Sequence, residues 1–328
     1  MSAVVSKATR RRSGVLEVLR GSPIIGPLAA LLLASIFFAT QTDRFLTGAN
    51  FSLIVQQVMV VGTLAIGQTL IILTSGIDLS AGSVMALSGV MMTGLAVNQG
   101  LNPLLAVVLG IGVALAFGLL NGALVTAIRL PAFIVTLGTL NIAFALTRIY
   151  TTSTITNLPD VLLFFGTTFN VAGTQITYGS VLMFVLYALT WFILRSTPAG
   201  RSVYAVGDNP EAARLAGINT TRVLIGVYVT AALTYGIAAL LLVARTGVGD
   251  PQAGQTSSLE SITAVVLGGT SLFGGRGTIV GTLIGVLIVG VFRNGLQLMG
   301  VESIYQVLIT GILVIVAVSI DQLSHRGK

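Results

Sequence analysis

Long apolar runs separated by short polar segments dominate the pattern of this chain. A helix needs about 20 apolar residues to cross the hydrocarbon core of a bilayer, within a range of about 17–25. Two of the runs, 84–98 and 259–273, are short and rich in Gly and Ser, which suits broken or partial crossings. The pattern predicts an all-α, polytopic membrane bundle of about ten transmembrane helices, at roughly 24–40, 52–74, 84–98, 102–128, 132–150, 176–194, 222–244, 259–273, 278–298 and 303–320.

Composition supports a membrane protein and excludes several classes of catalyst. Hydrophobic residues make up 54% of the chain and charged residues 8%, against about 25% charged in a soluble protein. The sequence has no cysteine, and its one histidine, His325, lies near the end. It therefore lacks the residues for a thiolate or histidine metal cluster and for a Ser/His or Cys/His catalytic arrangement. We expect no catalytic centre, metal or cofactor in this chain.

The distribution of basic residues predicts how the helices are oriented. With ten crossings and a cytoplasmic amino terminus, thirteen Lys and Arg fall on the inner side and three on the outer side, while Arg293 lies within a helix. This asymmetry follows the positive-inside rule, so both termini are predicted to be cytoplasmic. The same distribution accounts for the net charge of +7 without a nucleic-acid partner. We expect a basic cytoplasmic tail at 1–22, a transmembrane domain at 23–321 and a cytoplasmic tail at 322–328.

An internal repeat relates the two halves of the chain. The segments 74–82 and 246–254 share Thr, Asp, Ala and Gly at an offset of 172 residues. At an offset of 173, a Gly-Val pair and an Asn-Gly pair in 102–128 recur in 278–298. Because the charge distribution places Asp78 on the inner side and Asp250 on the outer side, we predict an inverted repeat of two five-helix halves.

The segment 76–83 is the first candidate for chemistry. An acidic residue beside hydrocarbon normally faces a cavity or a partner, so Asp78 and Ser80 are candidates for a substrate path along a discontinuous helix. Alternatively, Asp78 is only the acceptor of a capped cytoplasmic turn. Ser80 and Ser83 are expected to cap a helix that begins at about Val84.

Neutral amides inside the predicted helices are a second set of candidates. Each amide supplies both a donor and an acceptor, which suits an uncharged, hydroxyl-rich solute. Gln68 and Asn141 are the best candidates for the substrate path. The alternative is that such amides only form hydrogen bonds between helices.

The loop 195–221 contains the signals of a short helix. Asp208 or Asn209 can cap it, Pro210 occupies its first turn, and Gly217 ends it. A short helix along the membrane surface, bearing Glu211 and Arg214, is suited to docking a cytoplasmic partner. The alternative is an ordinary basic cytoplasmic loop.

Three segments, 76–84, 200–218 and 260–277, together resemble the ribose-type (monosaccharide) ABC transporter permeases, in the superfamily shared with branched-chain amino acid permeases. The resemblance runs from about residue 45 to Asp321. It implies a sugar importer in the bacterial inner membrane with a second permease copy, a cytoplasmic ATPase that binds ATP and Mg, and a periplasmic or lipoprotein sugar-binding protein. It also implies that the loop couples to the ATPase through Gly207, Asp208, Asn209, Glu211, Arg214 and Gly217.

The ATPase activity is expected in a partner chain, because no Walker A motif occurs in this sequence. Two alternatives remain for the function. One is the same architecture with an amino acid or nucleoside as cargo. The other is a secondary transporter or channel that works alone, although ion coupling usually needs ionisable residues within the spans, and Arg293 is the main example here.

Overall fold

The computed structural model describes residues 24–171 and 173–302, and then 304–306, 308–309, 311–312 and 315. The predicted tails at 1–22 and 322–328, and with them both chain termini, lie outside the described residues. Most of the tenth apolar segment, 303–320, lies outside them as well.

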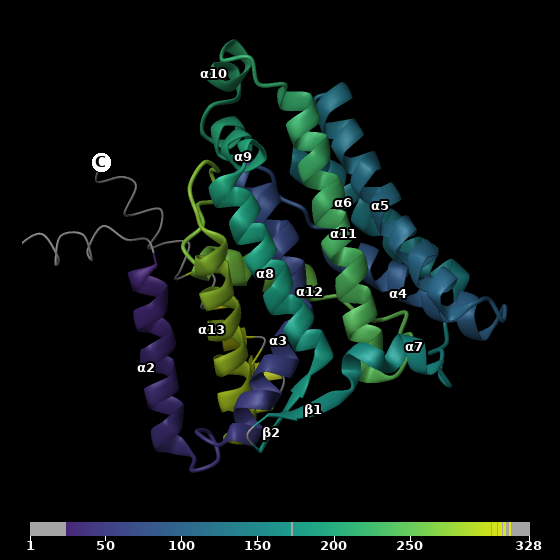
Figure 1. The fold of residues 1–328 in the computed structure, drawn as a ribbon, viewed down its shortest axis with the longest axis vertical. Helices are drawn as coiled ribbons and strands as arrows, with labels where there is room; N and C mark the ends of the chain where they lie inside the picture. Colours follow the sequence, from purple (N-terminus) through teal and green to yellow (C-terminus); the bar gives the residue numbers. More distant parts are fainter. Residues whose placement is uncertain are drawn as a thin grey trace, which may run out of the picture.

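The other nine predicted segments each contain one helix, and the all-α polytopic bundle is confirmed (Figure 1). Within the described part of the chain, six helices are long and apolar enough to cross a membrane, namely α3, α5, α6, α8, α11 and α13. The nine helices in the predicted segments are α2 (Ile25–Gln41), α3 (Gly48–Leu73), α4 (Ala81–Val97), α5 (Pro103–Ala127), α6 (Ala132–Tyr150), α8 (Tyr178–Ser196), α11 (Thr220–Thr246), α12 (Ser257–Leu267) and α13 (Ile279–Leu298).

Side-chain caps fix the starts of several of these helices. Asn102 accepts hydrogen bonds from the first turn of α5, where Pro103 takes the first position. Asn219 caps α11 in the same way, and Gly247 ends that helix in the left-handed conformation. These residues satisfy backbone groups that the helix itself leaves unpaired.

Three of the nine helices, α2, α4 and α12, are shorter than the six that can cross a membrane. At about 1.5 Å per residue, α12 with its 11 residues is about 16 Å long and α4 with its 17 residues about 25 Å. Both values fall below the ~30 Å hydrocarbon thickness. The expectation that 84–98 and 259–273 form partial crossings agrees with these lengths.

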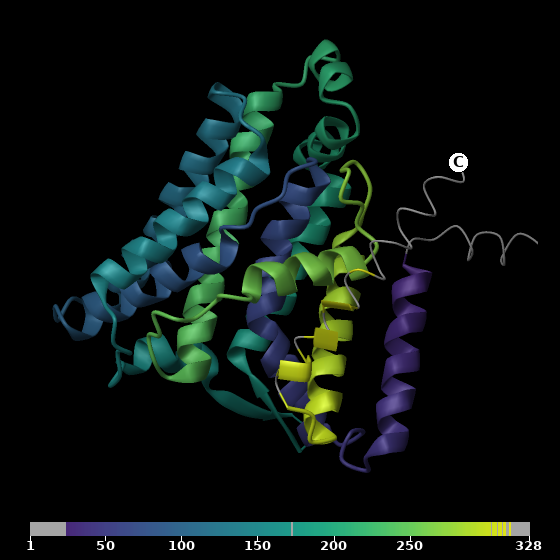
Figure 2. The same cartoon turned by 180° about the vertical axis from the view of Figure 1, so that it is seen from behind.

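The sequence pattern missed the structure between α6 and α8. That segment forms the short helix α7 (Asp160–Leu163), the 3-10 turn η1 (Phe164–Gly166) and a hairpin of β1 (Thr168–Val171) and β2 (Thr174–Thr177). The strands pair antiparallel, with Thr168 opposite Thr177. The hairpin lies at one end of the bundle, and α9 (Pro198–Asp208) and α10 (Pro210–Leu215) lie at the other (Figures 1 and 2). We call these the hairpin end and the α9–α10 end.

The order of helices supports the inverted repeat. Subtracting 172 from the bounds of α11 gives 48–74, which is almost the range of α3. The helices that follow, α4 and α5, correspond to α12 and α13, and α3 and α11 run in opposite directions through the bundle (Figure 1). Both are central, because 72% of the apolar window of each is buried, against 28% for α5, α6 and α8.

The two halves of the repeat meet at a pair of glycines. Gly82 lies in the first turn of α4 and Gly254 precedes α12, and a Cβ atom on either one would collide with the carbonyl oxygen of the other. Ser258 joins the same crossing, because its hydroxyl accepts from the Gly82 N–H at 2.7 Å and donates to the Leu79 carbonyl at 2.9 Å. These glycines are partners in the sequence alignment of the repeat, so the crossing lies where the two halves are related.

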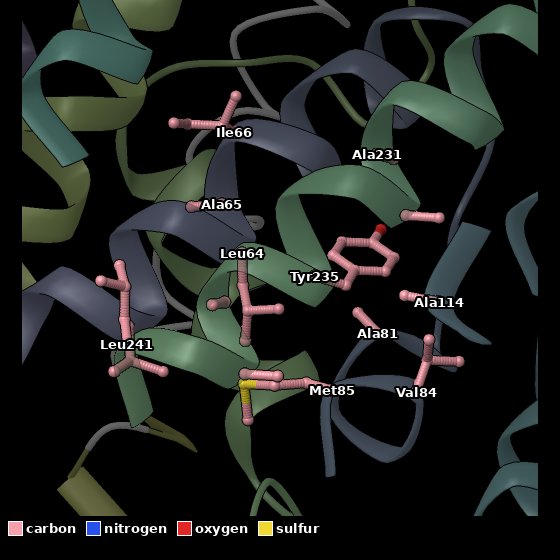
Figure 3. Close-up of a cluster of buried hydrophobic side chains, with 14 of the residues drawn as sticks. Leu64, Ala65, Ile66, Ala81, Val84, Met85, Ala114, Ala231, Tyr235 and Leu241 are labelled. Atoms are coloured by element: carbon pink, nitrogen blue, oxygen red, sulfur yellow. The ribbon is translucent and has the colours of Figure 1, made fainter. Parts of the chain in front are cut away.

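Small residues also set the packing of the core. Figure 3 shows the ring of Tyr235 on α11 beside Ala81, Ala114 and Ala231, which belong to α4, α5 and α11. All three alanines are fully buried and Tyr235 is 2% exposed. The alanines leave room for the aromatic ring, and the helices approach closely around it.

The placement of the two ends predicts which residues a membrane-impermeant reagent can reach. Because the chain has no cysteine, Thr152→Cys at the hairpin end and Ala216→Cys at the α9–α10 end each introduce a single thiol. A charged maleimide should label Thr152→Cys from outside intact cells and Ala216→Cys only in inverted vesicles. Labelling of both from the same side would contradict the topology.

Candidate functional site

Asp78 lies in the extended segment that joins α3 to α4, and its side chain is buried, with 1% exposed. One carboxylate oxygen accepts from the Ser80 N–H at 2.7 Å and from the Ser80 hydroxyl at 2.6 Å. The other accepts from the Tyr235 hydroxyl at 3.2 Å. A buried carboxylate is stable only when such donors replace water, so Asp78 holds the broken backbone between two helices.

Ser80 does not cap α4, and this expectation was wrong. The helix begins at Ala81 rather than at about Val84, and the Ser80 side chain makes no cap hydrogen bond to it. Its hydroxyl donates instead to the side-chain oxygen of Asp78, two residues earlier, at 2.6 Å. Ser83 lies inside the first turns of the helix rather than before it.

Gln68 joins the same network from α3. Its side-chain N–H donates to the Asp78 carbonyl at 2.6 Å, and Asn121 of α5 donates to the Ser80 hydroxyl at 3.2 Å. Three buried oxygens in these surroundings have no hydrogen-bond partner within the described part of the chain, namely those of the Gln68 and Asn121 amides and the Tyr228 hydroxyl. The structure thus brings together three predicted path residues, Asp78, Ser80 and Gln68.

Asn141 lies apart from these three. It is exposed on α6, and its amide donates to the Leu137 carbonyl of the same helix at 2.9 Å. Most residues of α6 are only partly covered by the rest of the chain. A single copy of the chain therefore does not place Asn141 on the same surface as Asp78.

The predicted docking loop folds into two helices, α9 and α10, rather than one. Asn209 caps α10 by accepting from the Ala212 N–H at 2.9 Å, and Pro210 takes the first position. Asp208 ends α9. Gly217 follows α10 with a φ of 85°, a conformation that suits glycine.

The outer surface of α10 combines charge with one apolar side chain. Glu211 and Arg214 form an ion pair at 2.7 Å, and both side chains are mostly exposed. Leu215 is 85% exposed. The helix projects beyond the ends of its neighbours (Figure 1). The charged pair and Leu215 are therefore free to contact another protein.

The inner side of α9 contacts loops from both halves of the repeat. The Ser75 hydroxyl lies 2.9 Å from the Gly207 carbonyl and 2.8 Å from the Phe273 carbonyl, and it can donate to either. Gly275 donates its N–H to the Leu73 carbonyl at 3.0 Å. A Cβ atom on Gly207 would collide with that same carbonyl. The loops 74–80 and 268–278 therefore meet at the end of α9.

A cavity of about 240 Å³ lies towards the hairpin end, between α3, α4, α11, α12 and α13. The charged and amide residues of its lining are Gln57, Arg245, Asp250, Glu260 and Arg293. Sequence reasoning named none of these as site residues. Two signals pointed to them: Arg293 is an arginine within a helix, and Asp250 is the repeat partner of Asp78.

Comparisons with known proteins identify relatives of the chain. A model of the family described as branched-chain amino acid transport system / permease component matches residues 50–318. The fructose import permease protein of Rhizobium meliloti is 46% identical over 311 residues, which cover 93% of this chain and 86% of that protein. The ribose import permease protein of Bacillus subtilis (strain 168) is 40% identical over 301 residues, covering 91% and 92%.

A third relative, from Sinorhizobium fredii (strain NBRC 101917 / NGR234), carries the name "Probable ABC transporter permease protein". It is 36% identical over 324 residues, which cover 98% of this chain and 95% of that protein. No solved structure matches the chain.

The Asp78 network predicts the effect of replacing its carboxyl group by an amide. We expect Asp78→Asn to insert and fold, with stability lower by about 1–3 kcal/mol because charge-assisted hydrogen bonds are lost, and to transport several-fold more slowly. Tyr235→Phe, which removes one donor, should have a smaller effect. Uptake into vesicles at equal protein level measures both. Wild-type transport by Asp78→Asn would show that the carboxylate is only structural.

Proposed function

Because the chain belongs to the family of branched-chain amino acid transport system permease components, we propose that it is the membrane subunit of an ATP-driven importer of monosaccharides. The names of the fructose and ribose import permeases, at 46% and 40% identity over nine tenths of this chain, support the cargo. The name of the Sinorhizobium fredii relative supports the ABC class.

The observation that carries this proposal is the junction at α9. A permease without an ATP-binding motif needs a surface that receives mechanical work from a partner ATPase, which binds ATP and Mg. The exposed face of α10 suits the docking of that ATPase, and the inner side of α9 contacts the loops 74–80 and 268–278 through Ser75, Gly207 and Gly275. In this proposal the chain lies in the bacterial inner membrane, and its α9–α10 end faces the cytoplasm.

The same contacts suggest how docking reaches the membrane. A shift of α9 would move both loops, because Ser75 lies within hydrogen-bond distance of Gly207 and Phe273. Only two residues, Gly76 and Ile77, lie between Ser75 and Asp78, so the shift would reach the buried carboxylate and the start of α4. Nucleotide-driven closure of the ATPases would thus change the positions of α4 and α12, which adjoin these loops.

A second permease copy completes the proposed path. Asn141 lies on the exposed face of α6, so it can line a path only together with another molecule. A second copy facing α6 would place two such amides along one central route. A periplasmic or lipoprotein sugar-binding protein would deliver the sugar at the hairpin end.

An amino acid is the alternative cargo, and the description of the family favours it. A zwitterion needs paired opposite charges along its route. Asn141 and Gln68 are neutral, and Asp78 is enclosed by its hydrogen-bond donors, so these three residues suit a neutral polyol. The opposite charges that line the cavity at the hairpin end fit either class of cargo, so the names of the relatives decide for a sugar.

The ion pair on α10 provides a test of docking. Glu211→Arg combined with Arg214→Glu keeps a pair within the helix and exchanges the two charges that the partner meets. We expect the swapped variant to fold with wild-type stability and to co-purify with several-fold less ATPase, because misplaced charges repel their former partners. Unchanged recovery of the ATPase would remove α10 from the docking surface.

Ser75 provides a test of coupling. Ser75→Ala should retain the ATPase and lower transport per ATP hydrolysed several-fold, because the hydroxyl that joins α9 to both loops is gone. Ser202→Ala on α9, whose hydroxyl donates only to the Pro198 carbonyl of the same helix, is the matched control. Sugar uptake and ATP hydrolysis in reconstituted vesicles give the ratio. An unchanged ratio in Ser75→Ala would contradict the relay.

A further inference from the structure

The charges around the cavity at the hairpin end are balanced. Arg245 and Arg293 contribute two positive charges, and Asp250 and Glu260 contribute two negative charges. Arg293 pairs with Glu260 at 3.5 Å, and Arg245 donates to the Gln57 carbonyl at 3.2 Å. A site with no net charge does not favour an ion, and its mixture of donors and acceptors can bind a neutral molecule with several hydroxyl groups. Its opposite charges also fit a zwitterion, so the choice of a sugar rests on the proposed function.

One acceptor in the wall has no partner. The side-chain oxygen of Gln57 is buried and forms no hydrogen bond within the described residues, although its N–H donates to Gln297 at 3.3 Å. A buried unpaired oxygen costs about 1–3 kcal/mol. Because that oxygen is enclosed, a ligand hydroxyl would supply the missing donor only after the Gln57 side chain turned towards the cavity.

The size and the apolar walls of the cavity fit the same class of ligand. Pockets for small molecules usually measure about 300–1,000 Å³, so a volume of about 240 Å³ suits one sugar ring rather than two. Val61, Met85 and Leu242 line the apolar part. Such walls can cover the C–H face of a sugar ring while the charged groups bind its hydroxyls.

The two loops of the inverted repeat differ in the surroundings of their aspartates. Asp250 lines it, whereas its repeat partner Asp78 is 1% exposed and is enclosed near the rings of Tyr228 and Tyr235. The same loop of the repeat is therefore held open towards the hairpin end and closed towards the α9–α10 end. Space beside Asp250 is not a general consequence of how this loop folds.

We infer that the cavity lined by Gln57, Arg245, Asp250, Glu260 and Arg293 is a monosaccharide-binding subsite within each permease chain. This inference rests on the proposed function and deepens it. Sugar released at the hairpin end would occupy this subsite before the closed loop at Asp78 opens. The subsite needs no residue from a second copy.

Direct binding tests the subsite. The full permease, alone in lipid nanodiscs, is titrated with D-fructose and D-ribose in saturation-transfer NMR, with L-leucine as the comparison. Glu260→Gln and Gln57→Met each remove one polar group and keep the size of the side chain. Asp160→Asn, at the hairpin end outside the cavity, is the control. We expect sugar binding that weakens about tenfold or more in the first two variants and is unchanged in the control.

Two other outcomes separate the subsite from the proposed function. The subsite is wrong if the assembled transporter, with its ATPase and binding protein, imports sugar with wild-type KM and rate when Glu260→Gln and Gln57→Met are combined. The proposed function itself fails if leucine, and neither sugar, binds the nanodiscs and is imported. Thermal unfolding of each variant confirms that it is folded.

Discussion

The close approach of Gly82 and Gly254 is the contact on which the rest of the structure depends. The chain reaches the short helices α4 and α12 from opposite ends of the bundle. Their backbones meet at Gly82 and Gly254, where neither glycine has room for a Cβ atom. Ser258 satisfies backbone groups on the other side of this crossing. Because neither short helix crosses the membrane alone, each relies on the other to bury its polar end.

This crossing explains why the functional groups lie where they do. The broken backbone before α4 requires an internal acceptor, which Asp78 supplies with donors from Ser80 and Tyr235. The corresponding break before α12 instead leaves Asp250 beside a cavity. The two copies of this loop thus differ: the copy with Asp78 forms a closed, hydrogen-bonded junction, and the copy with Asp250 borders the open, charged cavity. In the proposed mechanism, movement of α9 would act on the closed junction, and the solute would enter the open cavity.

Much of this fold could be predicted from the sequence, because hydrocarbon requires long apolar runs and the repeat left matching Thr, Asp, Ala and Gly residues. The ends of α10 could be predicted equally well, because Asn209, Pro210 and Gly217 begin and end a helix through contacts with neighbouring residues of the chain. The hairpin of β1 and β2 was missed because its Thr-rich strands carry no strong alternation.

The site was harder to predict than the fold. Ser80 resembles a cap, but the nearby Asp78 carboxylate competes for its hydroxyl. Asn141 and Gln68 are both amides within helices, and only packing separates the exposed one from the buried one. The cavity combines residues of five helices, so no local pattern could have gathered them.

ATP-dependent uptake by the reconstituted transporter tests the account most directly. Vesicles that contain this chain, its ATPase and its binding protein are supplied with ATP and with labelled D-fructose, D-ribose or L-leucine. The account predicts that at least one sugar accumulates, that accumulation requires ATP and the ATPase, and that leucine does not accumulate. Sugar accumulation driven by an ion gradient with the permease alone, or ATP-driven accumulation of leucine without either sugar, would contradict it.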